Sequence, residues 1–217
     1  MARKRNKEAT REAILAAART VLASDGPDAL SLSKVAHLAG INRGTAYQHF
    51  ETREELIKAT IDWVSEHLST TVFGGMGLDE DGYFSDATNR PVYEVIAQLV
   101  NFAVENPALG RIWLFEVLSS EKPGEDLFFR QFAQSTKGLA ESEESEENID
   151  VEALSVMLLA GYFLWPEWVR SHASTEQERQ GMAKRMQREV LRLCMHGVLK
   201  ADKFPHLEKF LEESKPT

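Results

Sequence analysis

Cysteine is nearly absent from this sequence, since Cys194 is the one cysteine among 217 residues. A chain with a single cysteine has no intrachain disulfide, and we therefore expect a reducing, cytoplasmic compartment. Cys194 lies among Leu191, Leu193 and Met195. This apolar setting predicts a small buried side chain and not a reactive thiol.

Long apolar runs are absent as well. The basic start, residues 1–7, is not followed by an apolar segment, which excludes a secretory signal peptide. The longest uncharged and mostly apolar run, residues 153–166, is shorter than the roughly 20 residues that a membrane-spanning helix needs. We therefore expect a soluble protein with no membrane partner.

The sequence lacks motifs for catalysis or metal binding. Its six histidines are scattered, and it contains no His-Glu-x-x-His motif, no glycine-rich phosphate loop and no nucleophile elbow. The segment Asp79-x-Asp81-Gly82 starts like a calcium loop but lacks the later ligands and the closing glutamate. We expect no enzymatic activity, no metal and no cofactor.

Charge is unevenly distributed along the chain. The formal net charge is −9, yet residues 1–50 contain eight basic and four acidic side chains, so they carry +4 and the remainder carries −13. A basic end on an acidic body favours contact of that end with a polyanion such as DNA. Residues 1–7 fit two interpretations, a disordered tail or a flexible basic arm that contacts phosphates.

Apolar residues recur at helical spacing through most of the chain, which predicts an all-α protein with about nine to ten helices. Proline, glycine and capping residues set the expected helix ends. Ser31 should cap the helix at residues 32–39, and Thr52 with Glu55 should form a capping box at the start of the helix at residues 53–71. Pro166 should kink the helix that contains it. The expected helices span residues 7–24, 32–39, 43–50, 53–71, 91–105, 108–119, 125–139, 151–171, 175–200 and 205–213.

Two segments between the expected helices read as loops. Residues 72–90 are rich in glycine and acidic residues, and residues 140–148 are rich in serine and glutamate. Their order or disorder stays open at this stage. We divide the chain into a DNA-binding domain, residues 1–53, and a helical domain, residues 54–217. The helix after the boundary either transmits movement between the domains or simply joins them.

Residues 31–50 have the pattern of a helix-turn-helix, in which Gly40 supplies the turn. The second helix is rich in hydrogen-bonding side chains, and Arg43 is its one fully charged residue. A helix in a DNA groove uses this mixture, whereas a helix that faces water usually carries more glutamate and lysine. A polar helix in an ordinary helical protein is the alternative.

The segment Ser31 to Leu56, SLSKVAHLAGINRGTAYQHFETREEL, closely resembles the DNA-binding domain of TetR-family transcriptional regulators. The resemblance is carried by Val35, Ala36, Ala39, Gly40, Gly44, Thr45, Tyr47, His49, Phe50 and the run Arg53-Glu54-Glu55-Leu56. It covers about a quarter of the chain, and the remainder resembles the family only in length and helical character. It implies a repressor that binds a palindromic operator in double-stranded DNA as a homodimer.

The resemblance also implies roles for single residues. Thr45 and Tyr47 would contact phosphates, Arg43, Gln48 and His49 would face bases or backbone, and Arg53 would hold a far phosphate. The family's usual lysine is Arg53 here, which keeps the charge and adds a fork. The residues that we assign to DNA contact are Ser33, Lys34, Asn42, Arg43, Gly44, Thr45, Tyr47, Gln48, His49 and Arg53.

The helices expected at residues 151–171 and 175–200 suit dimerisation. The first is apolar nearly all round, so it should be buried on both sides. Pairing of both helices with their copies would cover this excess apolar surface. The expected interface residues are Leu154, Met157, Leu158, Gly161, Met182, Met186, Val190 and Leu193.

Aromatic side chains in the C-terminal two-thirds suit a pocket for a small and largely apolar effector. Glu116 is the one acidic group among them and would be a buried acceptor or a solvent-facing residue. The expected pocket residues are Phe102, Trp113, Phe115, Glu116, Phe128, Phe132, Tyr162 and Trp165. Plain core packing is the alternative for each of them. A helical interaction module or scaffold without specific DNA binding is the alternative for the whole protein.

Overall fold

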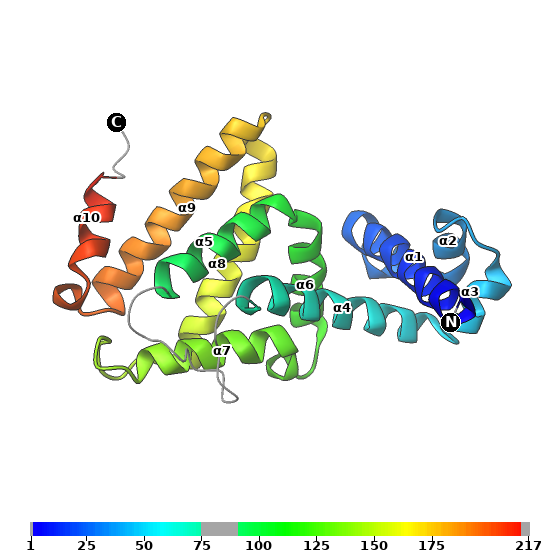
Figure 1. Cartoon of the computed structure of the whole chain (residues 1–217), viewed down its shortest axis with the longest axis horizontal. Helices are drawn as coiled ribbons and strands as arrows, with labels where there is room; N and C mark the ends of the chain where they lie inside the picture. The colour runs from blue at the N-terminus through cyan, green and yellow to red at the C-terminus, as the bar shows by residue number, and fades with distance from the viewer. Residues whose placement is uncertain (1, 75–90, 214–217) are drawn as a thin grey trace. The chain divides into compact units, whose positions relative to one another are not determined.

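The computed structural model of the chain describes residues 2–74 and 91–213. Within these residues the structure contains ten α-helices, three short 3₁₀ helices and no β-strand, so the all-α prediction is confirmed (Figure 1). In chain order the elements are α1 (Ala2–Asp25), η1 (Pro27–Ala29), α2 (Leu32–Leu38), α3 (Arg43–His49), α4 (Arg53–Phe73), α5 (Pro91–Glu105), α6 (Pro107–Ser119), η2 (Pro123–Glu125), α7 (Leu127–Ala140), α8 (Val151–His172), α9 (Glu176–Gly197), η3 (Ala201–Lys203) and α10 (Pro205–Glu213).

Helix α1 begins at Ala2, which corrects the expectation of a flexible arm over residues 1–7. Residues 2–13 contain neither glycine nor proline, and alanine, arginine, lysine and glutamate are good helix formers. The helix ends at Asp25, where Gly26 takes a φ of 78° and Pro27 follows. The basic residues at the start of the chain therefore extend the helix.

Two further helices differ from their predicted form. Helix α7 begins at Leu127, two residues later than expected, because the Asp126 side chain accepts a hydrogen bond from Phe129 N at 2.8 Å and caps the helix. Residues 123–125 form the separate η2 turn. Helix α8 runs from Val151 to His172, and Pro166 does not interrupt it.

The two expected loops have different outcomes. Helix α4 extends through Phe73, so the first loop starts later than residue 72; residues 75–90, which include the segment weighed as a calcium loop, lie outside the described residues. The second loop, residues 140–148, is tied to the end of α9. Glu146 N donates to Val198 O at 2.9 Å, and Lys200 N donates to Glu144 O at 2.9 Å.

The chain forms two compact units, each built from two separate stretches of sequence. The first unit comprises Met1–His67 and Ala108–Pro123, and the second comprises Leu68–Pro107 and Gly124–Thr217. Helix α4 therefore contributes residues to both units. Most of α6 belongs to the first unit, although its neighbours in sequence, α5 and α7, belong to the second.

The first unit packs α1 against α2 and α2 against α3 around an apolar core. Its fully buried side chains include Ile14, Leu15, Val21, Val35, Ala46, Phe50 and Leu56. Helix α1 also contacts α4, because the Arg19 guanidinium lies 3.6 Å from the centre of the Trp63 ring. Trp63 in turn stacks on His67 at 4.8 Å.

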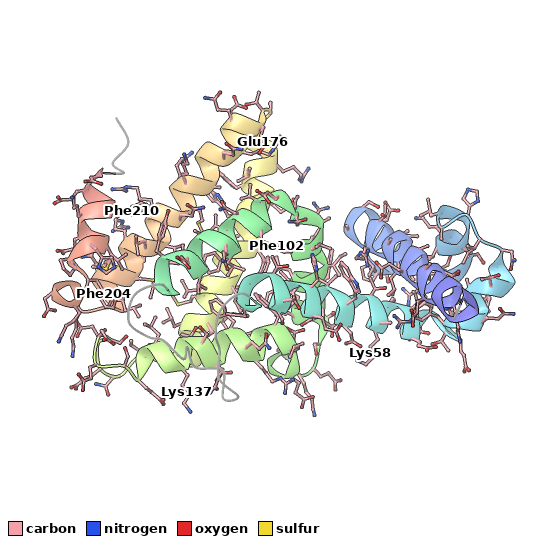
Figure 2. All side chains as sticks on the ribbon, in the orientation of Figure 1. Lys58, Phe102, Lys137, Glu176, Phe204 and Phe210 are labelled. Atoms are coloured by element: carbon pink, nitrogen blue, oxygen red, sulfur yellow. The ribbon has the colours of Figure 1, made fainter. Side chains whose placement is uncertain are left out.

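The second unit is built around helices α5, α7, α8 and α9, and its core contains a chain of aromatic rings. Phe128 of α7 lies 6.0 Å from the rings of both Phe73 and Phe163, and Phe132 lies 6.3 Å from the ring of Tyr162. Helix α10 joins this unit through Phe210, whose ring lies 4.6 Å from Tyr93 (Figure 2).

Candidate functional site

The turn between α2 and α3 is fixed by its own backbone. Gly40 has a φ of 67°, its N–H donates to His37 O at 3.2 Å, and Ile41 N donates to Ala36 O at 3.0 Å. These two bonds form the Schellman pattern that closes a helix C-terminus, and glycine takes the required left-handed conformation at low cost. The predicted helix-turn-helix geometry is present, with Gly40 at the turn.

Helix α3 starts at a tight cap made by Asn42. Its Oδ1 accepts hydrogen bonds from Thr45 N at 2.7 Å and from Thr45 Oγ1 at 3.0 Å. A Cβ at Gly44 would lie 3.3 Å from this oxygen, so glycine leaves room for the cap. Asn42 and Thr45, both assigned to DNA contact, thus also define where the helix begins.

Helix α3 separates apolar and polar residues onto opposite faces. Ala46 and the following Phe50 are fully buried and anchor the helix to the first unit. The exposed residues of the turn and helix are Asn42, Arg43, Gly44, Tyr47 and Gln48. A seven-residue helix that exposes these groups presents donors and acceptors of the kind that bind phosphates and base edges.

Arg43 and Tyr47 form a pair on the outer face of α3. Arg43 Nη2 donates to Tyr47 Oη at 3.2 Å, and the guanidinium carbon lies 5.3 Å from the centre of the tyrosine ring. The contact is a cation–π pair at i and i+4 spacing, and Tyr47 remains 41% exposed. The pair holds a guanidinium and a hydroxyl together at the surface.

Ser33 and Lys34 lie at the start of α2, where Ser31 caps the helix as predicted by accepting a hydrogen bond from Lys34 N at 3.2 Å. Ser33 is exposed. Lys34 Nζ donates to Asp25 Oδ2 at 2.7 Å, and this hydrogen bond lowers the pKa of Asp25. The charge of Lys34 is therefore partly offset by Asp25.

His49 lies close to basic residues of α1 that were not among the assigned contacts. Partial burial lowers the pKa of His49, and the positive charges of Lys7 and Arg11 lower it further. Arg11 also lies 5.2 Å above the ring of Phe50. Because α1 is helical from its start, Lys7 and Arg11 have fixed positions beside the end of α3. The one sequence feature that pointed to Lys7 and Arg11 was the excess of basic residues over residues 1–50.

Arg53 makes internal bonds that the sequence did not indicate. Its Nη2 donates to Pro27 O at 2.6 Å and its Nε donates to Leu30 O at 2.9 Å. Nη1 lies 3.3 Å from a carboxylate oxygen of Glu54. The fork of Arg53 thus joins the start of α4 to the segment between α1 and α2, in addition to any contact with DNA.

The N-terminus of α4 is capped by Thr52, as predicted. Thr52 Oγ1 accepts from Glu55 N at 3.1 Å. The Glu55 carboxylate bonds to the backbone N–H of Glu51 at 2.7 Å, one residue before the position that the predicted capping box requires. The cap sets the direction in which α4 leaves the helix-turn-helix.

The second unit contains a partly open cavity of about 170 Å³, lined by residues of four helices and of the segments that follow α7 and α9. Its lining residues are Val92, Val95 and Ile96 of α5, Phe132, Ser135, Thr136, Gly138 and Leu139 of α7, Leu154, Leu158 and Tyr162 of α8, Cys194 of α9, and Ser142, Glu144, Val198 and Phe204. Phe132 and Tyr162 are the two members of the expected pocket that line this cavity. Its walls combine branched aliphatic side chains with the rings of Phe132, Tyr162 and Phe204.

The other six expected pocket residues do not line this cavity. Phe102 and Phe128 are buried in the core, and Trp165 donates from Nε1 to Met182 O at 3.2 Å. Three residues belong to α6 in the first unit: Trp113, which is buried, Phe115, which is exposed, and Glu116, which is partly exposed. Most of the expected aromatic residues therefore lie in the core or on α6 and do not line the cavity.

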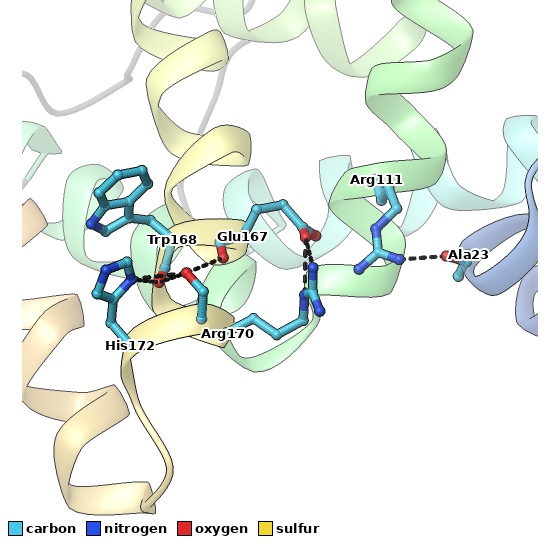
Figure 3. A network of polar contacts seen from close by, with 7 residues as sticks. Ala23, Arg111, Glu167, Trp168, Arg170 and His172 are labelled. Atoms are coloured by element: carbon cyan, nitrogen blue, oxygen red, sulfur yellow. Dashed lines mark hydrogen bonds and ion pairs between the residues drawn. The ribbon is translucent and has the colours of Figure 1, made fainter.

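The exposed face of α8 is an apolar stripe, defined by Ala153, Val156, Met157, Ala160, Leu164 and Trp168. Exposure reaches 70% for Met157, 66% for Leu164 and 57% for Trp168. Large apolar side chains in one continuous row are unusual on a monomer and typical of an interface. At the end of the row, Trp168 stacks on His172 at 4.8 Å (Figure 3).

The expected interface residues fall into three groups. Met157 and Leu193 are exposed, and Gly161 and Met186 are partly exposed, with Met186 Cε 3.5 Å from a Cβ placed on Gly161. Leu154 and Leu158 line the cavity. Met182 and Val190 are buried, which corrects their assignment to a surface. Val156, Leu164 and Trp168, which also lie on the stripe, were not among the expected interface residues.

No helix within residues 2–74 and 91–213 is long and apolar enough to cross a membrane. In the same residues, no cluster of three or more His, Cys, Asp or Glu side chains has the arrangement of a metal site. Cys194 is buried as predicted, and burial raises the pKa of its thiol to about 11.

Comparisons with known proteins agree with this geometry. Residues 14–60 match the family described as bacterial regulatory proteins, tetR family. The nucleoid occlusion factor SlmA of Idiomarina loihiensis is 26% identical over 165 residues, which span 72% of this chain and 80% of that protein. The DNA-binding transcriptional repressor TetR of Mycobacteroides abscessus is 39% identical over 69 residues, which span 32% of this chain and 36% of that protein.

Solved structures share the fold. A gamma-butyrolactone receptor, an ArpA-like protein, superimposes with a TM-score of 0.65 at 18% identity, and the match covers 97% of this chain and 100% of that chain. The ketosteroid transcriptional regulator KstR2 of Mycobacterium tuberculosis superimposes with a TM-score of 0.59 at 17% identity, covering 88% of this chain and 95% of that chain.

The helix-turn-helix with its polar outer face, joined to a helical second unit, defines a DNA-binding transcriptional regulator. Residues 14–60 thus carry the DNA-binding domain of the tetR family of bacterial regulatory proteins, and the whole chain has the fold of regulators of that family.

Proposed function

We propose that the protein is a ligand-responsive repressor that binds a palindromic operator as a homodimer. The observation that carries the proposal is the polar outer face of α3, where Arg43, Tyr47 and Gln48 are exposed while Ala46 and Phe50 anchor the helix from behind. Such a helix presents base-reading and phosphate-binding groups on a rigid support. We propose the same contacts for Ser33, Asn42, Gly44, Thr45 and His49, with Lys7 and Arg11 as added cations.

The homodimer part of the proposal is supported by the apolar stripe of α8. One recognition helix reads a few base pairs, whereas two helices related by a twofold axis read a near-palindrome with half-sites about one turn (~34–36 Å) or a multiple apart. A twofold interface brings the same patch of each copy together, so a continuous row such as Met157, Leu164 and Trp168 is suited to it.

The ligand response is supported by the cavity of the second unit and by the course of α4. Because α4 has residues in both units, a change in the second unit can displace it and alter the spacing of the two recognition helices. A ligand acts in this way only if it binds the two states with different affinities. We propose that DNA is released when the cavity is occupied.

Hydroxyl-radical footprinting on DNA from upstream of the protein's own gene tests the proposal. We expect two protected patches related by twofold symmetry, and steep weakening of binding as salt is raised, because phosphate contacts release counterions. A helical scaffold would protect no DNA at any salt concentration. Protection of one half-site alone, or of all sequences equally, would refute the operator-binding dimer.

A further inference from the structure

Two hydroxyl groups in the cavity of the second unit lack hydrogen-bond partners within the part of the chain that the structure describes. They are Tyr162 Oη on α8 and Ser135 Oγ on α7. Both residues are buried, yet neither oxygen is among the described side-chain atoms that lack both solvent contact and a hydrogen-bond partner. The two hydroxyls therefore face the space that they line, and each has an O–H to donate.

The neighbouring hydroxyls are already used as donors. Thr136 Oγ1 donates to Phe132 O at 2.9 Å, and Ser142 Oγ donates to Leu139 O at 2.8 Å. These bonds satisfy the backbone of α7 and leave Tyr162 and Ser135 as the hydroxyl donors available to a guest. A guest that offers no acceptor to them would leave buried donors unpaired, which is costly.

Charge in the cavity disfavours an anionic guest. Among the lining residues that the structure describes, Glu144 is the one charged residue; it is partly exposed, and its carboxylate would repel another carboxylate. Within residues 2–74 and 91–213, no lysine, arginine or histidine lines the space. Burial raises the pKa of Tyr162 well above its usual value and that of Cys194 to about 11, so both stay neutral. An ionised guest would lose its hydration without gaining a counter-charge.

The volume of the cavity limits the size of the molecule that it can bind. The cavity has a volume of about 170 Å³, and apolar cavities of roughly 150 Å³ are known to accept benzene. A single ring with a short substituent matches this space. Val95, Leu158 and Val198 supply apolar walls for such a ring.

We propose that this cavity binds an uncharged molecule of single-ring size that presents a carbonyl or ester oxygen to Tyr162 and Ser135. The inference rests on the proposed function, because it names the chemical class of the effector. A phenolic hydroxyl that remains protonated is a better donor than acceptor, which selects a carbonyl oxygen over a donor group on the guest.

Four probes of matched size test the proposal on the full-length protein: acetophenone, ethylbenzene, benzoate and benzylammonium. Isothermal calorimetry without DNA gives the affinity of each. We expect acetophenone to bind at least about tenfold more tightly than benzoate, because the carboxylate would be desolvated without a partner. We expect ethylbenzene to bind more weakly than acetophenone, since it leaves both hydroxyls unpaired.

The variant Tyr162→Phe removes one oxygen and keeps the ring. It should weaken the binding of acetophenone by about threefold to tenfold, which is the usual effect of one neutral hydrogen bond. The affinity for ethylbenzene should stay unchanged. Tyr93→Phe is the matched control, because Tyr93 packs on Phe210 and does not line the cavity. Ser135→Ala should also weaken the binding of acetophenone.

Equal binding of acetophenone and benzoate, tightest binding of benzylammonium, or binding of no probe would each overturn the inference. So would an equal loss of acetophenone and ethylbenzene in Tyr162→Phe, because that pattern reports altered packing. Operator release is measured separately. If acetophenone binds as described and no bound DNA is released, the ligand response of the proposed function fails while the chemistry of the cavity stands.

Discussion

Arg111 of α6 donates a hydrogen bond from Nη1 to the backbone carbonyl oxygen of Ala23 at 2.6 Å (Figure 3). Ala23 lies in the last turn of α1, and the residue four positions later is Pro27, which has no N–H to offer. Arg111 supplies the missing donor and places a positive charge at the helix C-terminus, where it is favourable. Two residues 88 positions apart are thus joined within the first unit.

Replacement of Arg111 by alanine should destabilise the first unit. The Ala23 carbonyl would lose a charge-assisted hydrogen bond, which is worth about 1.5–3 kcal/mol. Urea unfolding followed by circular dichroism measures the change in the free energy of unfolding. Arg130→Ala on α7 is the control, since Arg130 is exposed. Equal unfolding free energies for the two variants would show that the Arg111 bond contributes nothing.

Arg53→Lys should also lower stability, by about 1–2 kcal/mol, although the charge is kept. A lysine has one ammonium in place of the fork and does not reach both Pro27 O and Leu30 O in the observed geometry. The melting temperature and the operator affinity are measured together. An unchanged melting temperature with weaker DNA binding would assign Arg53 to phosphate contact alone.

Much of the helix-turn-helix follows from local sequence. Ser31 and Thr52 cap their helices as predicted, because capping depends on residues three positions apart. The membership of α6 in the first unit had no such signal, because the bond of Arg111 spans 88 positions. The same holds for Arg53, whose resemblance to a phosphate-binding position gave no sign of its bonds to backbone carbonyls.

The cavity was predicted less well than the fold. Aromatic residues were expected to line it, yet Phe102 and Phe128 fill the core because large rings bury the most apolar area. Besides Phe132 and Tyr162, the cavity is lined by aliphatic residues at helical spacing, such as Leu154 and Leu158, and this pattern is also the ordinary pattern of a core. Sequence periodicity alone does not distinguish a filled space from an open one.

Operator affinity should rise as pH falls, with His49 as the responsible group. The pKa of His49 is lowered in the free protein by burial and by the charges of Lys7 and Arg11. Nearby phosphates would raise that pKa in the complex, so the bound state takes up a proton and binding strengthens below the bound-state pKa. The gain in operator affinity ends below the lower pKa that His49 has in the free protein, because His49 is then protonated in both the free and the bound state.

The pH dependence is measured by fluorescence anisotropy at fixed ionic strength between about pH 8 and pH 5.5, a range that includes the usual histidine pKa. His49→Gln should flatten the profile, because glutamine keeps hydrogen bonding but does not titrate. His206→Gln on α10 is the control and should leave the slope intact. A slope that survives in His49→Gln would assign the proton to another group.

Leu164→Glu should convert the dimer to a monomer without unfolding it. Leu164 is 66% exposed in the single chain, so the substitution costs little in the monomer and buries a charge in the dimer. Sedimentation velocity should give half the dimer mass. Leu118→Glu is the matched control, because Leu118 is an exposed leucine on α6 and is not part of the stripe. A dimer that persists in Leu164→Glu would place the interface elsewhere.

The most direct test of the account is the sequence preference of Arg43→Ala, measured by anisotropy on the operator and on a scrambled duplex at one salt concentration. We predict a loss of about 1–3 kcal/mol on the operator and a smaller loss on the scrambled DNA, because a bidentate base contact is removed. Lys209→Ala, which removes an exposed charge from α10, should change neither affinity. Equal binding by the wild-type protein and Arg43→Ala on both duplexes would contradict the claim that the outer face of α3 reads DNA.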